Sequence, residues 1–421
     1  MARAALSLSA LIASLILLVS GNAFLMTLLG LRLSIEGFNA TLIGWILVFY
    51  SVGFVAGTLY AGRIIQRVGH IRAFAVFAAI LATAILLHPL AVEAGLWGLL
   101  RAVGGFVIAG LMIVIESWFS SKADNKNRAS LFAVYQVVFF LSTAGGQVLI
   151  RVSDPAGYIP FSLAAILVIL AVVPLSLTRT QSPVMETTSR LSLRQLFRTS
   201  PVGGLGALLA GLLISAFYTM GPVYANNIGL EVNEISNFMA AAIIAAMILA
   251  WPVGQLCDRY SRYKIMLGAA ALAGICSLVA ALLGSFNMPL LIFFVGLYMG
   301  ISAALYPIAV AITNDLMDSR QITAASTALL LSYGVGSCIG PIISSAFMEL
   351  LGPRGLFISS ALILGGLSLL MLTRFGQPKT PVSEQEQFVT TTPEATLGLQ
   401  EIDPRNPGFD EESEEVEGRG S

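Results

Sequence analysis

The clearest structural signal in this chain comes from two similar stretches, GRIIQRVGHIR at residues 62–72 and GQLCDRYSRYK at residues 254–264. Each follows a long apolar run, begins with glycine, has arginine at its sixth position and ends with a basic residue. The two stretches are offset by 192 residues. A charged turn that recurs after equivalent apolar runs indicates an internal repeat. We therefore expect the chain to consist of two equivalent halves.

Twelve apolar runs surround these turns. Of the 421 residues, 57% are hydrophobic and 11% charged, against about 25% charged in a globular protein. A bilayer core of about 30 Å needs about 20 apolar residues in a helix, the conformation that satisfies its own backbone groups in lipid. The runs lie near residues 4–31, 40–61, 73–92, 95–119, 128–150, 156–177, 203–225, 235–256, 265–286, 288–312, 324–348 and 355–373. The prediction is an all-α membrane protein, with twelve transmembrane helices in two pseudo-symmetric six-helix bundles.

The polar segments divide the chain further. We expect an N-terminal bundle at residues 1–178, a cytoplasmic linker at 179–201 and a C-terminal bundle at 202–375. The tail, residues 376–421, has eleven acidic and three basic residues and few large apolar ones, so it cannot bury a core and is expected to be disordered. Regulation by attraction of this tail to basic loops is the alternative to a merely solvated extension.

Charge sets the orientation. Seventeen Lys and Arg fall on the membrane face that holds the N-terminus, and three, Arg32, Arg151 and Arg354, fall on the other. Because loops rich in Lys and Arg stay in the cytoplasm, both termini are predicted to be cytoplasmic. The chain is then a multi-pass protein of the plasma membrane, which is the inner membrane in bacteria.

Several kinds of function are disfavoured. Two histidines and three scattered cysteines give no metal site or disulfide framework. No Gly-Lys pair is present for a phosphate-binding loop. We therefore expect no cofactor, no metal and no enzyme activity. A net charge of zero argues against a nucleic-acid partner, which leaves the lipid bilayer and a small-molecule solute, with protons, as expected partners of a functional monomer.

The paired turns resemble those of the major facilitator superfamily, and the resemblance covers about residues 4–375. The matching residues are Gly62, Arg67, Gly69 and Arg72 in the first copy and Gly254, Asp258, Arg259, Arg262 and Lys264 in the second. Gln66 stands where the family has an acidic residue, and Ser261 stands where it has glycine. Other strings resemble the YcaD-like bacterial subgroup, namely VIES at 114–117, NR at 127–128, LYPIA at 305–309 and LLLSYGVGS at 329–337.

The resemblance implies a secondary active transporter that works by alternating access. Proton-coupled export is the favoured mode, and symport or uptake by facilitated diffusion are the alternatives. A non-transporting membrane sensor on the same scaffold is the alternative from a different class. Such a sensor is expected to lack charges inside the bundle and to carry a large folded soluble domain, and this sequence fits neither expectation.

Two ionisable residues lie deep in the fourth span, where charges are costly and are functional candidates. Arg101 and Glu116 are fifteen residues apart, about 22 Å along a helix, so they cannot pair with each other. Arg101 resembles the superfamily's fourth-helix arginine, which implies substrate or proton coupling; snorkelling to the outer interface is the alternative. Glu116 either exchanges a proton with the cavity or anchors loop arginines as part of a gate, and the gate is favoured.

The repeated turns are candidates for a cytoplasmic gate, with ordinary positive-inside determinants as the alternative. A tight turn at Gly69 would pack the loop under neighbouring helices. Asp258 could accept hydrogen bonds from a helix N-terminus or from an arginine of the opposite half. Such a charged clasp would hold the cytoplasmic side shut when the cavity opens outward.

Small residues predict close helix crossings in the fifth and eleventh spans. They are Gly146, Gly336 and Gly340, the last followed by Pro341. Polar and aromatic residues deep in the spans are candidates to line a cavity, although each also suits a core position. They are Asn22, Tyr135, Gln136, Gln147, Tyr218, Tyr298, Tyr306 and Tyr333. Together they predict a mostly apolar pocket with one arginine, compatible with a small anion or an amphipathic organic molecule.

Overall fold

The computed structural model describes residues 2–123, 127–177, 192–284, 286–317 and 322–373. Twelve helices in these ranges are long and apolar enough to cross a membrane, which confirms the predicted number of spans. No strand occurs in the described residues. The predicted tail and most of the predicted linker lie outside them.

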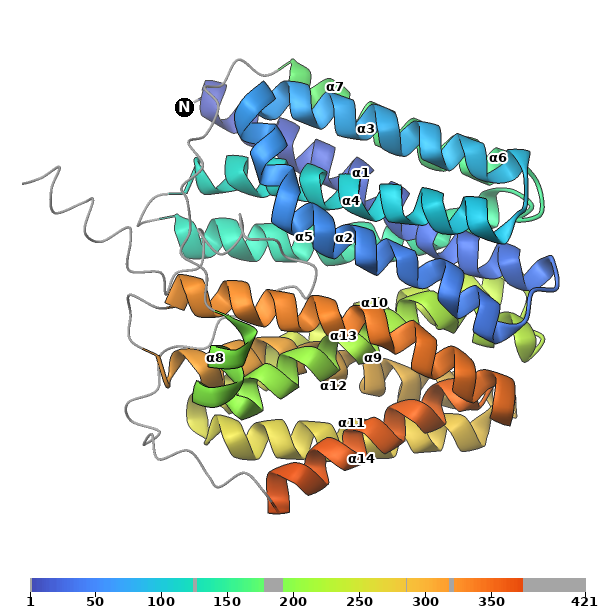
Figure 1. Ribbon diagram of the computed structural model, residues 1–421, viewed down its shortest axis with the longest axis vertical. Coiled ribbons are helices and arrows are strands. Elements are labelled where there is room, and N and C mark those ends of the chain that lie inside the picture. The colour runs from blue at the N-terminus through green and yellow to red at the C-terminus, as the bar shows by residue number, and fades with distance from the viewer. Residues whose placement is uncertain (1, 124–126, 178–191, 285, 318–321, 374–421) are drawn as a thin grey trace, which may run out of the picture.

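The helices form two groups, which Figure 1 shows one above the other with their long axes side by side. The first group contains α1 (Ala2–Ile35), α2 (Ala40–Val68), α3 (His70–Leu87), α4 (Ala94–Ser120), α5 (Arg128–Val148), α6 (Ile159–Leu170) and α7 (Val172–Ser176). The second contains α8 (Leu193–Thr199), α9 (Pro201–Asn227), α10 (Val232–Arg259), α11 (Arg262–Leu283), α12 (Met288–Asn314), α13 (Ile322–Leu351) and α14 (Gly355–Thr373). We call these groups the first and second halves.

Two details of the helices differ from the expected spans. The sixth span is divided, because a turn at Ala171 separates α6 from α7. The end of the expected linker forms the short helix α8. The hydroxyl of Ser192 caps α8 by accepting a hydrogen bond from the Gln195 amide at 3.3 Å, and Leu196 is fully buried. The buried Leu196 and the Ser192 cap therefore order a stretch that the sequence, with its arginines, predicted to be only a linker.

Successive spans run in opposite directions, so the bundle has two ends. The basic end is the one at which α2 ends at Val68, α4 at Ser120 and α10 at Arg259. The Arg151 end holds the opposite connections, including the 3₁₀ turn Leu149–Val152 after α5. In Figure 1 the basic end lies on the side marked N.

The repeated turns lie at the basic end but have different backbones. Gly69 adopts a φ of +87°, and its amide donates to the Ile65 carbonyl at 2.8 Å. A positive φ suits glycine. Ser261, at the equivalent place in the second half, has a φ of −55°, so serine is accommodated there without strain.

Glycines at equivalent positions of the two halves touch the first membrane-spanning helix of their own half. A Cβ added at Gly146 of α5 would collide with backbone and side-chain atoms of Ser20 and Ala23 in α1. A Cβ at Gly340 of α13 would collide with the carbonyl of Leu212 in α9. Both crossings therefore depend on a bare backbone, and the two halves share this arrangement.

Candidate functional site

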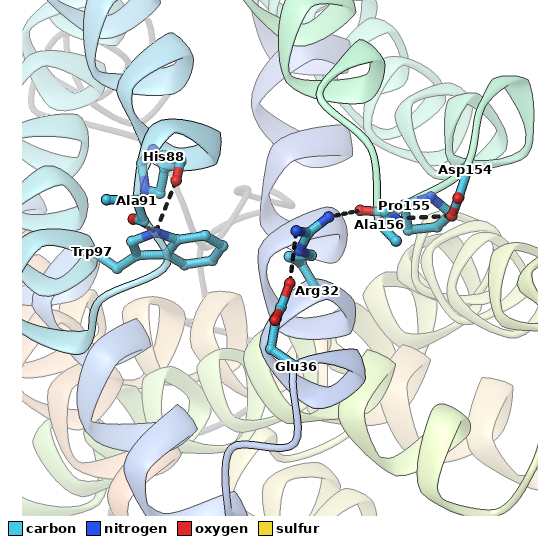
Figure 2. A network of polar contacts seen from close by, with 8 residues as sticks. All are labelled: Arg32, Glu36, His88, Ala91, Trp97, Asp154, Pro155 and Ala156. Atoms are coloured by element: carbon cyan, nitrogen blue, oxygen red, sulfur yellow. Dashed lines mark hydrogen bonds and ion pairs between the residues drawn. The ribbon is translucent and has the colours of Figure 1, made fainter.

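The start of α4 is firmly held and sets the depth of Arg101. The Glu93 carboxylate accepts hydrogen bonds from the amides of Gly95 at 3.1 Å and Leu96 at 2.7 Å, and these two donors lower the pKa of Glu93. Four residues later, the buried Trp97 donates its indole N–H to the carbonyls of His88 and Ala91, both at 3.0 Å (Figure 2). Arg101 lies one helical turn further into the membrane.

Glycines bring α2 and α4 close enough for Arg101 to reach an aromatic ring. A Cβ at Gly105 would overlap the Tyr50 carbonyl, and a Cβ at Gly53 would overlap the Ala102 carbonyl. The helix backbones therefore touch at this crossing. As a result, the Arg101 guanidinium carbon lies 4.3 Å from the centroid of the Tyr50 ring, a cation–π geometry.

Arg101 is a buried cation with neutral partners. It is 2% exposed, and its Nη2 donates to the Met26 sulfur at 2.7 Å. Its Nε has no hydrogen-bond partner, and no carboxylate among the described residues forms an ion pair with it. A buried charge normally has a charged partner because desolvation is expensive. The described contacts of this side chain supply no such charged partner.

A hydrogen bond from α1 reaches Tyr50, the residue whose ring lies against Arg101. The Asn22 side-chain amide donates to the Tyr50 hydroxyl at 3.1 Å. Asn22, Met26, Tyr50 and Arg101 thus form a connected set drawn from α1, α2 and α4. The sequence offered both a cavity position and snorkelling for Arg101, and the structure places the guanidinium inside the first half.

A cavity of about 50 Å³ lies beside this set, between the two halves. We call it the central chamber. It is lined by Met26, Tyr50, Ser51 and Phe54 of the first half and by Ile214, Ser215, Tyr218, Thr219, Tyr333 and Ser337 of the second. Met26 and Tyr50 contact the Arg101 guanidinium and also line the chamber, so these two side chains connect the charge to the space.

A larger cavity of about 300 Å³ lies between α2 and α13. We call it the seam chamber. It is lined by Phe54, Val55, Thr58, Leu59, Thr327, Ala328, Leu330, Leu331, Tyr333, Gly334 and Ser337. Phe54, Tyr333 and Ser337 line both chambers. Towards the Arg151 end, α2 and α13 meet so closely that a Cβ at Gly44 would overlap the Ser345 side chain.

The other predicted cavity residues are divided between the chambers and the interiors of the halves. Tyr218 and Tyr333 line the central chamber, and the Tyr306 ring packs edge-on against Tyr333 at 5.3 Å. Tyr298 is buried within the second half, where it donates to Ser360 at 3.0 Å. Gln147 is buried between α5 and α1, in contact with Thr27.

Glu116 is buried in the first half, away from Arg101. It is 0% exposed, and its Oε1 accepts a hydrogen bond of 2.7 Å from the Tyr135 hydroxyl, which connects α4 to α5. Gln136, the residue after Tyr135, is also buried. Glu116 lies one turn before the end of α4, and therefore near the basic end.

One of the predicted gate residues is deeply buried and ion-paired. Arg262, 2% exposed, pairs with Asp315 at the end of α12 and donates to the Ala311 carbonyl at 3.2 Å. The other charged residues of the repeated turns are exposed; they are Arg63, Arg67, Arg72, Asp258, Arg259 and Lys264. Gly62 is half-buried and Gly254 is buried.

Hydrogen bonds join the halves at the Arg151 end. Arg151 donates from Nε to the Ser236 hydroxyl at 2.8 Å and from Nη2 to Asn237. The Ser34 hydroxyl bonds to Asn227 at 3.1 Å and receives a bond from Asn226 at 2.9 Å. We call these contacts the polar latch.

Arg32, at the same end, bonds only within the first half in the contacts described. Figure 2 shows its ion pair with Glu36, at 2.6 Å, and its hydrogen bond to the Pro155 carbonyl, at 3.2 Å. The described contacts of Arg151 therefore join the two halves, whereas those of Arg32 lie inside one half.

Sequence reasoning did not identify Met26, Phe54, Thr58 or Ser337 as site residues. A methionine and a phenylalanine in an apolar run look the same whether they face lipid or a cavity. One signal was present, since Tyr50, Phe54 and Thr58 recur every four residues and so share a helix face. The Tyr50 and Phe54 rings are stacked with centroids 6.2 Å apart.

Comparisons with known proteins agree with this architecture. The sequence profile of the Major Facilitator Superfamily matches residues 6–301 and 204–404. The "Uncharacterized MFS-type transporter YcaD" of Escherichia fergusonii is 30% identical over 369 residues, which cover 86% of this chain and 94% of that protein. The "Uncharacterized MFS-type transporter Ent638_1421" of Enterobacter sp. (strain 638) is 29% identical and covers 89% of this chain and 97% of that one.

Solved structures show the same fold. The nucleoside transporter NupG has a TM-score of 0.74 at 14% identity and covers 89% of this chain and 100% of its own. A bacterial homologue of the human lysosomal transporter Spinster, in an inward-facing and occupied conformation, has a TM-score of 0.69 at 14% identity, with 89% and 97% covered. The predicted fold and the YcaD-like resemblance are confirmed, as is the prediction of a transporter and not an enzyme.

Proposed function

The chain belongs to the major facilitator superfamily, and from that premise we propose that it exports a small organic anion across the plasma membrane by proton-coupled alternating access. The basic end faces the cytoplasm in this proposal, with both termini on that side. Arg101 holds the anion, and Glu116 takes part in coupling or gating. The chain works as a monomer.

The observation that carries the proposal is the environment of Arg101. Its guanidinium is buried, has a thioether and an aromatic ring as partners, and is connected to the central chamber by Met26 and Tyr50. An anion that enters the chamber would complete the charge pair that the protein leaves open. Because a buried charge gains most from a partner in a medium of low dielectric constant, this site favours an anion over a neutral solute.

The arrangement of the halves supports alternating access. The polar latch holds them together at the Arg151 end, and the seam chamber lies nearer the basic end than the contact between Gly44 and Ser345. If the basic end faces the cytoplasm, a solute would reach the site from inside the cell. Loading from the inside is the first step of an export cycle, the direction proposed here.

Glu116 supports coupling to protons. A carboxyl group buried in a span is a candidate to carry a proton, and the Glu116 carboxylate accepts a hydrogen bond from the Tyr135 hydroxyl. A gate that responds to this proton would link the protonation of the first half to the position of the basic loops. In this proposal Glu116 serves both roles predicted from the sequence: it exchanges a proton and anchors the gate.

The test uses full-length protein in liposomes. Organic anions are first screened by thermal shift, because a ligand of the folded state raises the apparent stability by mass action. Transport of the resulting anion is then measured with and without an imposed pH gradient. We expect wild-type transport to depend on the gradient, and Arg101→Gln to abolish both the thermal shift and transport.

Arg63→Gln is the matched control. Arg63 also lies over a tyrosine ring, Tyr60, at 5.4 Å, but both residues are exposed. Glu116→Gln is expected to bind the anion and lose the response to the gradient. Undiminished transport by Arg101→Gln would refute the proposed anion site, and an undiminished gradient response of Glu116→Gln would refute the role of Glu116 in coupling. Wild-type transport unaffected by the gradient would indicate facilitated diffusion.

A further inference from the structure

Two of the four hydroxyl-bearing residues that line the seam chamber, Thr58 and Ser337, bond to the backbone of their own helices. The Thr58 hydroxyl donates to the Phe54 carbonyl of its own helix at 3.0 Å. The Ser337 hydroxyl donates to the Gly334 carbonyl, also within its own helix, at 2.8 Å. Both groups are satisfied by the backbone, so they offer no donor hydrogen to an occupant. The remaining wall is largely leucine, valine, alanine and phenylalanine.

A cavity of this size and chemistry favours an apolar occupant. Its volume of about 300 Å³ falls at the lower end of the range for small-molecule sites. Water in a cavity needs two to four polar partners, and an apolar cavity of about 150 Å³ in another protein stays dry and takes up hydrocarbons. Hydrocarbon chains or rings therefore suit this space better than water does.

The two chambers are continuous in their walls. Phe54, Tyr333 and Ser337 line both, and the stacked rings of Tyr50 and Phe54 extend the wall from the seam chamber to the residue that covers Arg101. The central chamber, at about 50 Å³, has room for a few water-sized groups. In this conformation its size suits a head group such as a carboxylate and is too small for a sugar or a nucleotide.

We propose that the two chambers form one site for an amphipathic organic anion, with the anionic head in the central chamber beside Arg101 and the apolar arm in the seam chamber. This inference rests on the proposed function and names the class of its substrate. Met26 is flexible and unbranched; when it rotates aside, the Arg101 Nη2 can donate to the head group.

The position of the seam chamber also connects the apolar arm to the conformational change. The chamber lies between α2 of the first half and α13 of the second, the surfaces that move relative to each other in alternating access. An apolar arm held there contacts both halves at once. The length and shape of the arm therefore determine which anions the conformational change accepts.

The probe for this proposal is a medium-chain carboxylic acid with a photoreactive diazirine at its far end, added to full-length protein in lipid nanodiscs. The matched probe is its primary amide, which has the same tail and no charge. We expect the acid to label α2 and α13 residues of the seam chamber, as located by peptide mass spectrometry. Labelling by the amide should be weaker by about tenfold or more, corresponding to about 1.4 kcal/mol for loss of the charge pair.

Two pairs of variants test where the tail binds. Val55→Phe and Leu331→Phe fill the seam chamber, whereas Val52→Phe and Val335→Phe add the same ring at exposed positions of the same helices. We expect the first pair to lose labelling by the acid and the second pair to keep it. Thermal unfolding of all four shows whether each remains folded, and either filling variant suffices for the test.

The outcomes separate this inference from the function on which it rests. Equal labelling by acid and amide would indicate a site for bilayer lipid tails and would overturn the proposal, as would labelling that survives Val55→Phe and Leu331→Phe. If labelling survives in those variants while Arg101→Gln still abolishes transport of a short anion, the bipartite site fails and the proposed function stands. If Arg101→Gln transports normally, the proposed function fails as well.

Discussion

Replacing Arg151 with alanine should shift the protein towards a conformation that is open at the Arg151 end. Arg151 belongs to the first half, and its guanidinium holds Ser236 and Asn237 of the second half. No bond within its own half is described for this guanidinium, so the substitution removes contacts that exist only while the two halves meet at this end. The stability of each half should change little.

The size of the shift follows from the two hydrogen bonds. A bond from a charged donor contributes about 1.5–3 kcal/mol when sheltered from solvent. The bond to Ser236 is partly buried and the bond to Asn237 is exposed, so the second contributes little. The Ser236 hydroxyl keeps its own bond to the Gln147 carbonyl at 2.9 Å. A net loss of about 1.5–2 kcal/mol would change the ratio of the two conformations by about tenfold to thirtyfold.

The separation of the halves at the basic end can be measured by double electron–electron resonance. Spin labels at Gln66 and Gln255, which are exposed near that end, report the distance in protein whose three native cysteines are replaced by alanine. Arg151→Ala should enrich the short-distance population. Arg32→Ala is the control, because Arg32 bonds to Glu36 and Pro155 within the first half. The reasoning is refuted if Arg151→Ala leaves the distance distribution unchanged or if Arg32→Ala shifts it equally.

Three further predictions concern stability, measured by thermal unfolding in detergent. Gly336→Ala should destabilise the protein by about 1–3 kcal/mol or more, because the added Cβ would overlap the α9 backbone. Gly366→Ala is the control: a Cβ there meets no atom within 4 Å, so this change should be neutral or stabilising by up to about 1 kcal/mol. Arg262→Ala should cost about 3–5 kcal/mol, because it removes the buried cation that pairs with the Asp315 carboxylate; a loss no greater than at an exposed arginine would contradict this. The pKa of Glu93 is lower in the folded protein than its ordinary value of about 4.3. Ionised Glu93 therefore stabilises the folded state above that value, and the stabilisation is lost as the pH falls through the folded pKa. The stability difference between wild type and Glu93→Gln should be present at neutral pH and shrink below about pH 4.

The sequence predicted the twelve spans and the two halves because both are local properties. The length of an apolar run decides whether a helix can cross a bilayer, and the repeated basic turns mark equivalent places in the two halves. The boundaries differed where a single side chain intervened, as at α8, where the buried Leu196 orders part of the expected linker. Whether such a leucine is buried can be judged only when its neighbours in the fold are known.

The site could be predicted only in part for the same reason. Arg101 stands out in sequence because a charge in a span is rare, and Tyr218 and Tyr333 were among the cavity candidates. Met26 was not, because only the fold places its sulfur against the guanidinium and its side chain at the central chamber. Tyr298 carried the same sequence signal as Tyr333, yet its hydroxyl is used inside the second half. Polarity identifies candidates, whereas helix rotation decides which of them face the chamber.

The buried polar groups of the two halves differ in what they connect. Glu116 and Tyr135 tie α4 to α5 inside the first half, and Arg262 with Asp315 ties α11 to the end of α12 inside the second. Both pairs lie near the basic end, where the seam chamber leaves α2 and α13 apart. The partly exposed polar latch connects the halves at the Arg151 end. Since bonds sheltered from water are harder to exchange than exposed ones, each half should move as a unit while the latch opens, which is the mechanical requirement of alternating access.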